Sequence, residues 1–340
     1  MAIIITFGEL MLRLQPYNYE RFVQCDHVEF TFGGGEANVA VSLANYGMDV
    51  AYVTKLPTHA IGQAAVNSLR RYGVDTTLIT RGGERVGIYF NEKGASQRPS
   101  KVIYDRAHSA IAESRREDYD WDRIFEGADW FHFSGITPAL GGELLEICLD
   151  ACKKAKELGL TISFDPNYRA KLWTVAEASV AIKQLMPYVD LLIVNENQAA
   201  QFFEISIPDA ERSGDDITDE GYRFLAEQIS VQYGVPMVAL TERRTFSVDE
   251  NSLCAKLYDG KQLYSSDKYR MRMIDRVGSG DSFAAGLLYA LRHNFAPNDA
   301  IRFAAAASCL NHSIEGDYNI LSVEEVLSLA NGNGTGRVQR

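Results

Sequence analysis

The chain has 340 residues, of which 46% are hydrophobic and 23% are charged, a composition typical of an ordered globular protein rather than a disordered or fibrous one. Its 34 basic and 45 acidic side chains give a net charge of -11, which argues against nucleic acid or an anionic membrane as a partner. The five cysteines are scattered without a CxxC pair, so neither a disulfide framework nor a zinc site is expected.

No targeting segment is apparent in the sequence. Residues 1–7 lack a basic region followed by an apolar core, and no apolar run is long enough to cross a bilayer. We therefore expect a cytoplasmic protein. We also expect residues 1–330 to form one domain, followed by a flexible Gly/Asn-rich tail at 331–340.

Strand and helix patterns alternate along most of the chain, beginning with a β-branched strand at residues 2–6. The further predicted strands are 50–54, 76–80, 130–133, 161–164, 191–194 and 237–240, and the predicted helices are 36–45, 61–72, 143–158, 220–233, 282–292, 299–311 and 323–330. This alternation predicts an α/β fold with a doubly wound, mostly parallel sheet. Ligands of such sheets bind beyond the carboxyl ends of the strands, so the residues that follow each strand deserve inspection.

Two segments interrupt the alternation. Residues 13–32 mix apolar and polar side chains like exposed antiparallel strands, and strands at 87–91 and 101–104 flank a polar turn, as in a hairpin. We expect these segments to form a small, discontinuous β-sheet lid at about residues 9–32 and 86–107.

The sharpest chemical signal is the run Gly278-Ser279-Gly280-Asp281, directly before an apolar helix. Two glycines let backbone N–H groups converge at a helix N-terminus, which predicts an anion site. Asp281 would then accept a proton from a substrate hydroxyl while the amides stabilise a phosphoryl group in transfer. The alternative is a simple turn and helix cap, for which the same residue types are favoured.

Three further clusters are weaker when taken alone. Gly33-Gly34-Gly35 precedes a helix that carries Asn38, the segment 165–169 (Asp-Pro-Asn-Tyr-Arg) follows a predicted strand, and Tyr104 and Arg106 end a lid strand. Each has an ordinary alternative: a loop, a Pro-initiated turn with self-capping Asp and Asn, or strand packing and surface charge. No GxxxxGK[ST] loop occurs, and the glycine run lacks the dinucleotide fingerprint.

Taken together, the early glycines, the D-x-N-x-R segment and the late G-x-G-D resemble the ribokinase (PfkB-type) family of carbohydrate kinases over roughly residues 3–330. The resemblance implies a Rossmann-like αβα domain with a β-sheet lid, ATP as phosphoryl donor, Mg²⁺ as helper and a monovalent cation as a further candidate. It also implies Asp281 as catalytic base and Gly278, Ser279 and Gly280 as anion hole. For ATP it points to Asn167, Asn195, Thr241, Arg243, Gly278 and Gly280.

Within the family, Tyr104-x-Arg106 and the run 275–278 (Asp-Arg-Val-Gly) are most similar to 2-keto-3-deoxygluconate kinases. This likeness implies phosphorylation of the terminal hydroxyl of a sugar acid, giving its 6-phosphate. The implied substrate residues are Gly34, Gly35, Asn38, Tyr89, Tyr104, Arg106, Arg169, Asp281 and Asp317. Physical reasoning agrees, because paired arginine forks suit a carboxylate. Arg13 strengthens the acid interpretation, since many neutral-sugar kinases of the family carry an aspartate there.

Two departures from the family pattern concern the donor side. The metal-associated N-x-x-E reads Asn195-Glu196-Asn197-Gln198, which leaves the metal ligand undetermined and Glu196 as a candidate. The loop after residue 240, usually rich in glycine, has none at 241–248.

Alternatives remain at this stage. They are a fructokinase or 5-keto-2-deoxygluconokinase of the same fold, a nicotinamide-dependent oxidoreductase, and a non-catalytic sugar sensor. The exposed edges of the lid favour a homo-oligomer, with a dimer through the lid as the simplest form.

Overall fold

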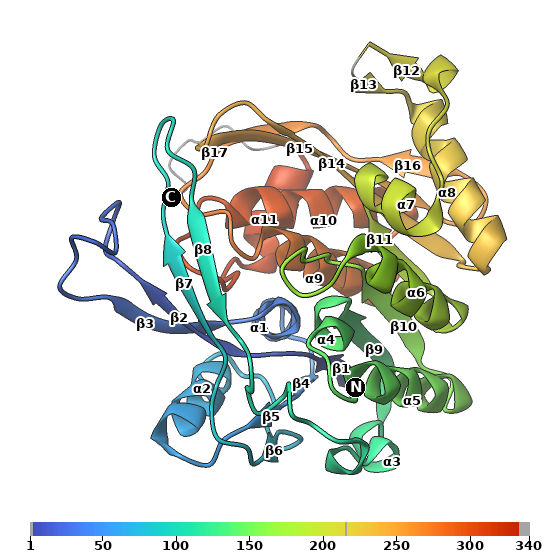
Figure 1. Cartoon of the computed structure of the whole chain (residues 1–340). Coiled ribbons are helices and arrows are strands. Elements are labelled where there is room, and N and C mark those ends of the chain that lie inside the picture. The colour runs from blue at the N-terminus through green and yellow to red at the C-terminus, as the bar shows by residue number, and fades with distance from the viewer. Residues whose placement is uncertain (1–2, 215, 333–340) are drawn as a thin grey trace.

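A computed structural model describes residues 3–214 and 216–332 (Figure 1). Within these residues the main sheet has nine strands, whose path runs β16-β15-β14-β11-β10-β9-β1-β4, with β17 paired to β15. The pairs from β14 to β4 are parallel, whereas β15 pairs antiparallel with β14, β16 and β17. The predicted α/β fold with a mostly parallel sheet is confirmed.

The parallel strands are β1 (Ile3–Phe7), β4 (Val50–Val53), β9 (Ala128–Ser134), β10 (Thr161–Asp165), β11 (Leu191–Val194) and β14 (Met237–Thr245). The antiparallel extension comprises β15 (Glu250–Tyr258), β16 (Leu263–Ser265) and β17 (Tyr269–Arg272). Short two-stranded pairs are β5 (Lys55–Leu56) with β6 (Thr80–Arg81) and β12 (Arg212–Ser213) with β13 (Asp216–Ile217).

Helices cover both faces of the main sheet (Figure 1). One face packs against α1 (Gly35–Asn45), α2 (Ala60–Arg70), α9 (Ser279–Arg292), α10 (Pro297–Asn311) and α11 (Val323–Ala330). The other packs against α3 (Trp121–Ile124), α5 (Leu144–Glu157), α6 (Val175–Leu185), α7 (Glu196–Phe203) and α8 (Asp219–Tyr233). The short α4 (Ile136–Ala139) follows β9.

The apolar core is divided by the sheet into two layers. Along β1, Ile4 lies in one cluster, whereas Ile5 and Phe7 lie in the other. A strand buried on both faces is mostly apolar, because successive side chains point to opposite sides. For this reason β1 is apolar at four of its five positions, and the exception, Thr6, is also buried.

A small four-stranded sheet stands beside the main body, with the order β3-β2-β7-β8 (Figure 1). Its strands are β2 (Met11–Gln15), β3 (Glu29–Gly33), β7 (Ile88–Glu92) and β8 (Lys101–Asp105). The register places Arg13, Tyr89 and Tyr104 in one row. The row on the opposite face contains Leu14, Phe30, Phe90 and Ile103. One face of this small sheet is therefore polar and aromatic, and the other is apolar.

Local geometry corrects three of the expected elements. The strand expected at 76–80 is reduced to β6, because the Asp75 carboxylate accepts the Thr77 N–H at 2.8 Å and forms a turn. Helix α9 begins at Ser279 rather than near residue 282, which puts Asp281 inside its first turn. Strand β14 continues to Thr245, because residues 241–245 pair with β15.

The expected flexible tail lies outside the described residues from position 333 onward. Among the described residues, no helix combines the length and apolar character needed to cross a membrane.

Candidate active site

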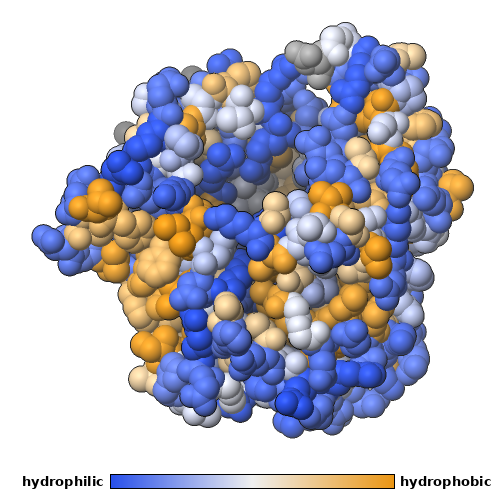
Figure 2. All heavy atoms as spheres, viewed as in Figure 1, coloured by the Kyte–Doolittle hydropathy of each residue, from blue (hydrophilic) through white to orange (hydrophobic). Residues whose placement is uncertain are grey.

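A cavity of about 610 Å³ opens between the small sheet and the carboxyl ends of β10, β11 and β14. Figure 2 shows this side of the molecule hollowed next to the small sheet. Apart from Arg13, its lining includes the site residues predicted from the sequence: Gly34, Gly35, Asn38, Tyr89, Tyr104, Arg106, Asn167, Arg169, Asn195, Glu196, Thr241, Arg243, Gly278, Ser279, Gly280, Asp281 and Asp317. Their individual roles stay predictions, but the fold brings them to one place.

The N-terminus of α9 forms the floor of the cavity. Gly278 caps this helix with a φ of 78°, a conformation that side chains rarely adopt. A Cβ atom at this position would also lie 2.2 Å from the Asp317 carbonyl oxygen. The amides of the first turn have no carbonyl partner within a helix. The backbone therefore offers N–H groups and the positive end of a helix dipole to an anion.

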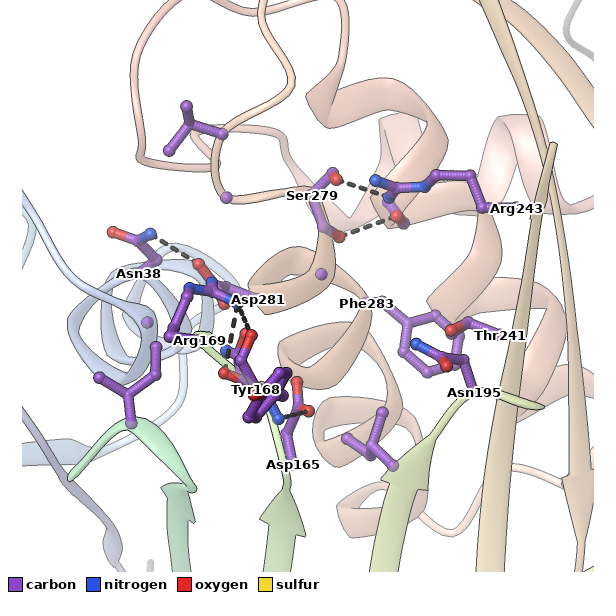
Figure 3. Close-up of a pocket in the computed structure, with 18 of the residues that line it drawn as sticks. Asn38, Asp165, Tyr168, Arg169, Asn195, Thr241, Arg243, Ser279, Asp281 and Phe283 are labelled. Atoms are coloured by element: carbon purple, nitrogen blue, oxygen red, sulfur yellow. Dashed lines mark hydrogen bonds between the residues drawn. The ribbon is translucent and has the colours of Figure 1, made fainter. Parts of the chain in front are cut away.

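Asp281 lies in this first turn and accepts a hydrogen bond from Asn38 Nδ2 at 2.7 Å (Figure 3). Removal from water raises the pKa of Asp281 to about 7, and the negative charges of Asp165 and Glu36 act in the same direction. The Asn38 bond and the charge of Arg169 oppose them. A carboxylate balanced near neutral pH is suited to accepting a proton.

The segment after β10 contributes a second carboxyl and an arginine. Asp165 accepts the Asn167 N–H at 2.8 Å, and burial raises the pKa of Asp165 to about 6. Arg169 donates Nη1 to the carbonyls of Asn167 and Tyr168 at 3.2 and 3.1 Å. These are neutral acceptors, so the charge of Arg169 remains available to an acidic ligand.

The small sheet contributes an aromatic wall with a cation. Arg106 lies 4.3 Å above the Tyr104 ring, and its Nε is 3.5 Å from a carboxylate oxygen of Glu9. Arg106 is only 8% exposed. Its Nε and Nη1 nonetheless lack a hydrogen-bond partner within the described part of the chain. A buried donor without an acceptor is unfavourable, which points to a ligand that supplies one.

Arg13 does not serve the role inferred for it from the sequence. It is 1% exposed, and its guanidinium is bound to Asp317 at 2.5 Å and to Asp275 at 2.8 Å. The Tyr89 hydroxyl donates to the same Asp317 carboxylate at 2.6 Å. Arg13 is therefore neutralised inside the protein, and it ties the small sheet to the loops before α9 and α11 instead of receiving a sugar acid.

The opposite side of the cavity is built from β14 and the start of α7. Asn195 caps α7, and its backbone N–H is in turn bonded by Gln198, so both side chains are engaged in a capping box. Arg243 projects from β14 and donates to Ser279 Oγ at 2.8 Å (Figure 3). The expected glycine-poor loop is thus partly strand, which fixes Arg243 beside the anion-binding turn.

The described residues around the cavity form no cage of acidic, His or Cys side chains for a resident metal. Glu196 forms an ion pair with Arg212. No group of three His, Cys, Asp or Glu side chains in residues 3–214 and 216–332 could hold an ion.

Several lining residues were missed by sequence reasoning, among them Arg276, Phe283 and Ser308. Arg276 stands two positions before Gly278, Phe283 follows Asp281 on α9, and Ser308 on α10 donates to the Ser279 carbonyl at 2.8 Å. Arg276 had a usable signal in its distance from the glycine turn. Phe283 and Ser308 had none, because an apolar or small side chain in a helix normally indicates core packing.

Comparison with known proteins agrees with this architecture. A family model described as pfkB family carbohydrate kinase matches residues 1–228 and 249–323. The 2-dehydro-3-deoxygalactonokinase of Haloferax volcanii is 32% identical over 98% of both chains. The crystal structure of 2-dehydro-3-deoxygluconokinase from Thermotoga maritima is 48% identical, with a TM-score of 0.93 over 98% of this chain and 100% of that one. A putative 2-keto-3-deoxygluconate kinase from Enterococcus faecalis is 28% identical, with a TM-score of 0.91 over 100% and 99% of the two chains.

Proposed function

The chain belongs to the pfkB family of carbohydrate kinases, and from that premise we propose that it transfers the terminal phosphoryl group of ATP to the terminal hydroxyl of a sugar acid. The acid expected first is 2-keto-3-deoxygluconate, which would leave as its 6-phosphate. The names of the Thermotoga maritima and Haloferax volcanii proteins support a 2-keto-3-deoxy sugar acid as the substrate class.

The observation that carries this proposal is the buried, incompletely bonded guanidinium of Arg106. A substrate carboxylate would supply the missing acceptors through charge-assisted hydrogen bonds, and Arg169 lines the same cavity. A neutral sugar such as fructose would leave those donors unsatisfied, at a cost of about 1–3 kcal/mol. The acid is therefore preferred over the neutral sugar.

The chemical step follows from the arrangement around Asp281. The substrate oxygen forms a bond to the γ-phosphorus while the bond from that phosphorus to the bridging oxygen breaks, and the electron pair of the broken bond leaves with ADP. The hydroxyl proton passes to Asp281, and the amides of Gly278, Ser279 and Gly280 stabilise the charge on the phosphoryl oxygens. The small sheet, at about residues 9–32 and 86–107, would act as the lid that excludes water.

Magnesium enters this proposal as part of the substrate, bound to ATP. Mg²⁺ in kinases is commonly held by one or two carboxylates together with the phosphates, so a dedicated cage is not needed. Glu196 is the candidate for a contact with that ion. The substitution Glu196→Gln measures its contribution through the Mg²⁺ concentration at half-maximal turnover. Replacing K⁺ by choline in the same assay measures any use of a monovalent cation.

We further propose that the enzyme works in the cytoplasm as a homodimer that pairs through the small sheet. The apolar face of the small sheet includes Phe30 and Ile103, which are 49% and 46% exposed. Apolar residues appear in this region of Figure 2. An exposed apolar face with free strand edges favours association with a second copy. Light scattering of the purified protein measures the mass directly.

The function itself is tested by coupled ADP release with MgATP and a panel of 2-keto-3-deoxygluconate, 2-keto-3-deoxygalactonate, gluconate, fructose and ribose. The expected result is the highest kcat/KM for a 2-keto-3-deoxy acid. Preference for fructose or ribose would retain the kinase and reject the acid pocket, whereas no ADP release with any acceptor would reject the proposed function.

A further inference from the structure

Two arginines lie next to the anion-binding turn, and neither has an acidic partner among the described residues. Arg243 donates to the Ser279 hydroxyl, which is its only side-chain partner among the described residues. Arg276 lies at the rim of the same cavity and is exposed. In the part of the chain that the structure describes, its guanidinium makes neither a hydrogen bond nor an ion pair.

The two positive charges also repel each other. Arg243 is, like Arg276, an exposed residue on the cavity wall. Partial loss of water around its guanidinium, together with the charge of Arg276, lowers the pKa of Arg243 to about 10. Burial lowers the pKa of His312 to about 4, and the same two positive charges act in the same direction, so that this histidine is neutral. A like-charge cluster that the fold leaves uncompensated indicates a site that an anion completes.

The acidic side chains on this side of the cavity are already engaged. Glu242 pairs with Lys268 at 3.0 Å, and Glu196 pairs with Arg212. Neither can neutralise the arginines without giving up a partner. The missing negative charge must therefore come from the ligand, and a triphosphate brings several charged oxygens whose geometry suits the guanidinium fork.

We propose that Arg243 and Arg276 form a two-arginine clamp on the terminal phosphates of ATP, with Arg243 acting from β14 and Arg276 from the loop before α9. The proposal rests on the kinase function above. As the bond to the γ-phosphorus breaks, negative charge moves onto the bridging oxygen of ADP, and fixed positive charge beside it lowers the barrier. Ser279 links the clamp to the anion hole by holding the Arg243 guanidinium.

The test uses Arg276→Ala, Arg276→Lys and Arg243→Met in the full-length enzyme. Arg272→Ala is the matched control, because Arg272 is an exposed arginine four residues earlier and outside the cavity. Removing one fixed donor to a transferring group typically costs about 10²–10³ in kcat. We expect that loss for Arg243→Met. For Arg276→Ala we expect about tenfold, because no side chain among the described residues fixes its guanidinium as Ser279 fixes that of Arg243, and water screens its charge, with partial recovery in Arg276→Lys.

A binding measurement distinguishes the clamp from a general structural effect. Calorimetry should show that Arg276→Ala weakens ATP about tenfold while AMP, which lacks the terminal phosphates, binds as it does to the parent protein. Equal losses for ATP and AMP, or kinetics that match Arg272→Ala, would overturn the clamp. A parent enzyme without turnover would instead overturn the kinase proposal. Arg276 is exposed, so its variants should melt like the parent even if Arg243→Met does not fold.

Discussion

The hydrogen bond from Asn38 to Asp281 gives a quantitative test of the catalytic base. Asn38 Nδ2 donates to Asp281 Oδ2 at 2.7 Å, and this bond lowers a pKa that burial has raised to about 7. A hydrogen bond to a charged group contributes about 1.5–3 kcal/mol, and one pKa unit corresponds to about 1.4 kcal/mol. The substitution Asn38→Ala should therefore raise the pKa of Asp281 by roughly one to two units.

The consequence is measurable as a shift of the pH profile of kcat/KM. The base works when it is charged, so activity rises with pH through the pKa of Asp281. At pH 7 about half of the parent enzyme has a charged Asp281 and is active. An increase of one unit in the pKa of Asp281 leaves roughly a tenth of the enzyme active at this pH, which is a fivefold loss that disappears above pH 9. Asn45→Ala on the same helix α1 is the control, because Asn45 bonds the Leu321 carbonyl instead. Coincident midpoints for Asn38→Ala and Asn45→Ala would refute this account of the base.

Three further substitutions test the site. Asp281→Asn should reduce kcat by about 10²–10⁴ with little change in substrate binding, and calorimetry with single-turnover kinetics checks both. Asp281→Asn should also stabilise the free protein at pH 8 but not at pH 4. The pKa of Asp281 is higher in the folded than in the unfolded protein, so the parent loses stability as pH rises from 4 through 7, whereas the variant does not. Equal melting temperatures of the parent and Asp281→Asn at pH 8 would contradict this. Arg106→Ala should raise the KM for the acid by about 10- to 150-fold and leave the low activity on fructose unchanged, as substrate profiling would show. Gly278→Ala should lower the melting temperature more than Gly47→Ala. Both glycines have a positive φ, but only at Gly278 would an added Cβ meet backbone, at the Asp317 carbonyl. Equal decreases in melting temperature would mean that this contact is unimportant.

The sequence predicted the parallel part of the fold well, because each strand there is a short apolar run followed by a helix pattern. It failed at β14 and β15, where residues 241–245 are largely charged and read as a loop. Those residues form a strand only because β15 pairs with them, and this information lies in tertiary structure rather than in local propensity. The register of β14 then determines that Arg243 reaches Ser279.

The residues of the site were predictable where a motif fixes both position and chemistry, as at Gly278 and Asp281. Arg13 shows the limit of such reasoning. Its type and position suggested a carboxylate ligand, but its partners, Asp275 and Asp317, lie 262 and 304 positions away in sequence. No local pattern reveals that a charge is already neutralised by residues so distant. A buried arginine can be interpreted only after its acceptors have been located.

The distribution of charge explains why an acidic protein is suited to bring two anions together. ATP and a sugar acid repel each other, and a net charge of -11 would repel both. The cavity counters this locally, with Arg106 and Arg169 on the side assigned to the acid and Arg243 and Arg276 on the side assigned to the triphosphate. Asp281 lines the same cavity, where a permanent charge would oppose both substrates. Because its pKa is near 7, Asp281 can accept the hydroxyl proton at modest cost while the phosphoryl group is transferred. Burial destabilises the charged carboxylate, and by the same effect it makes Asp281 a suitable base.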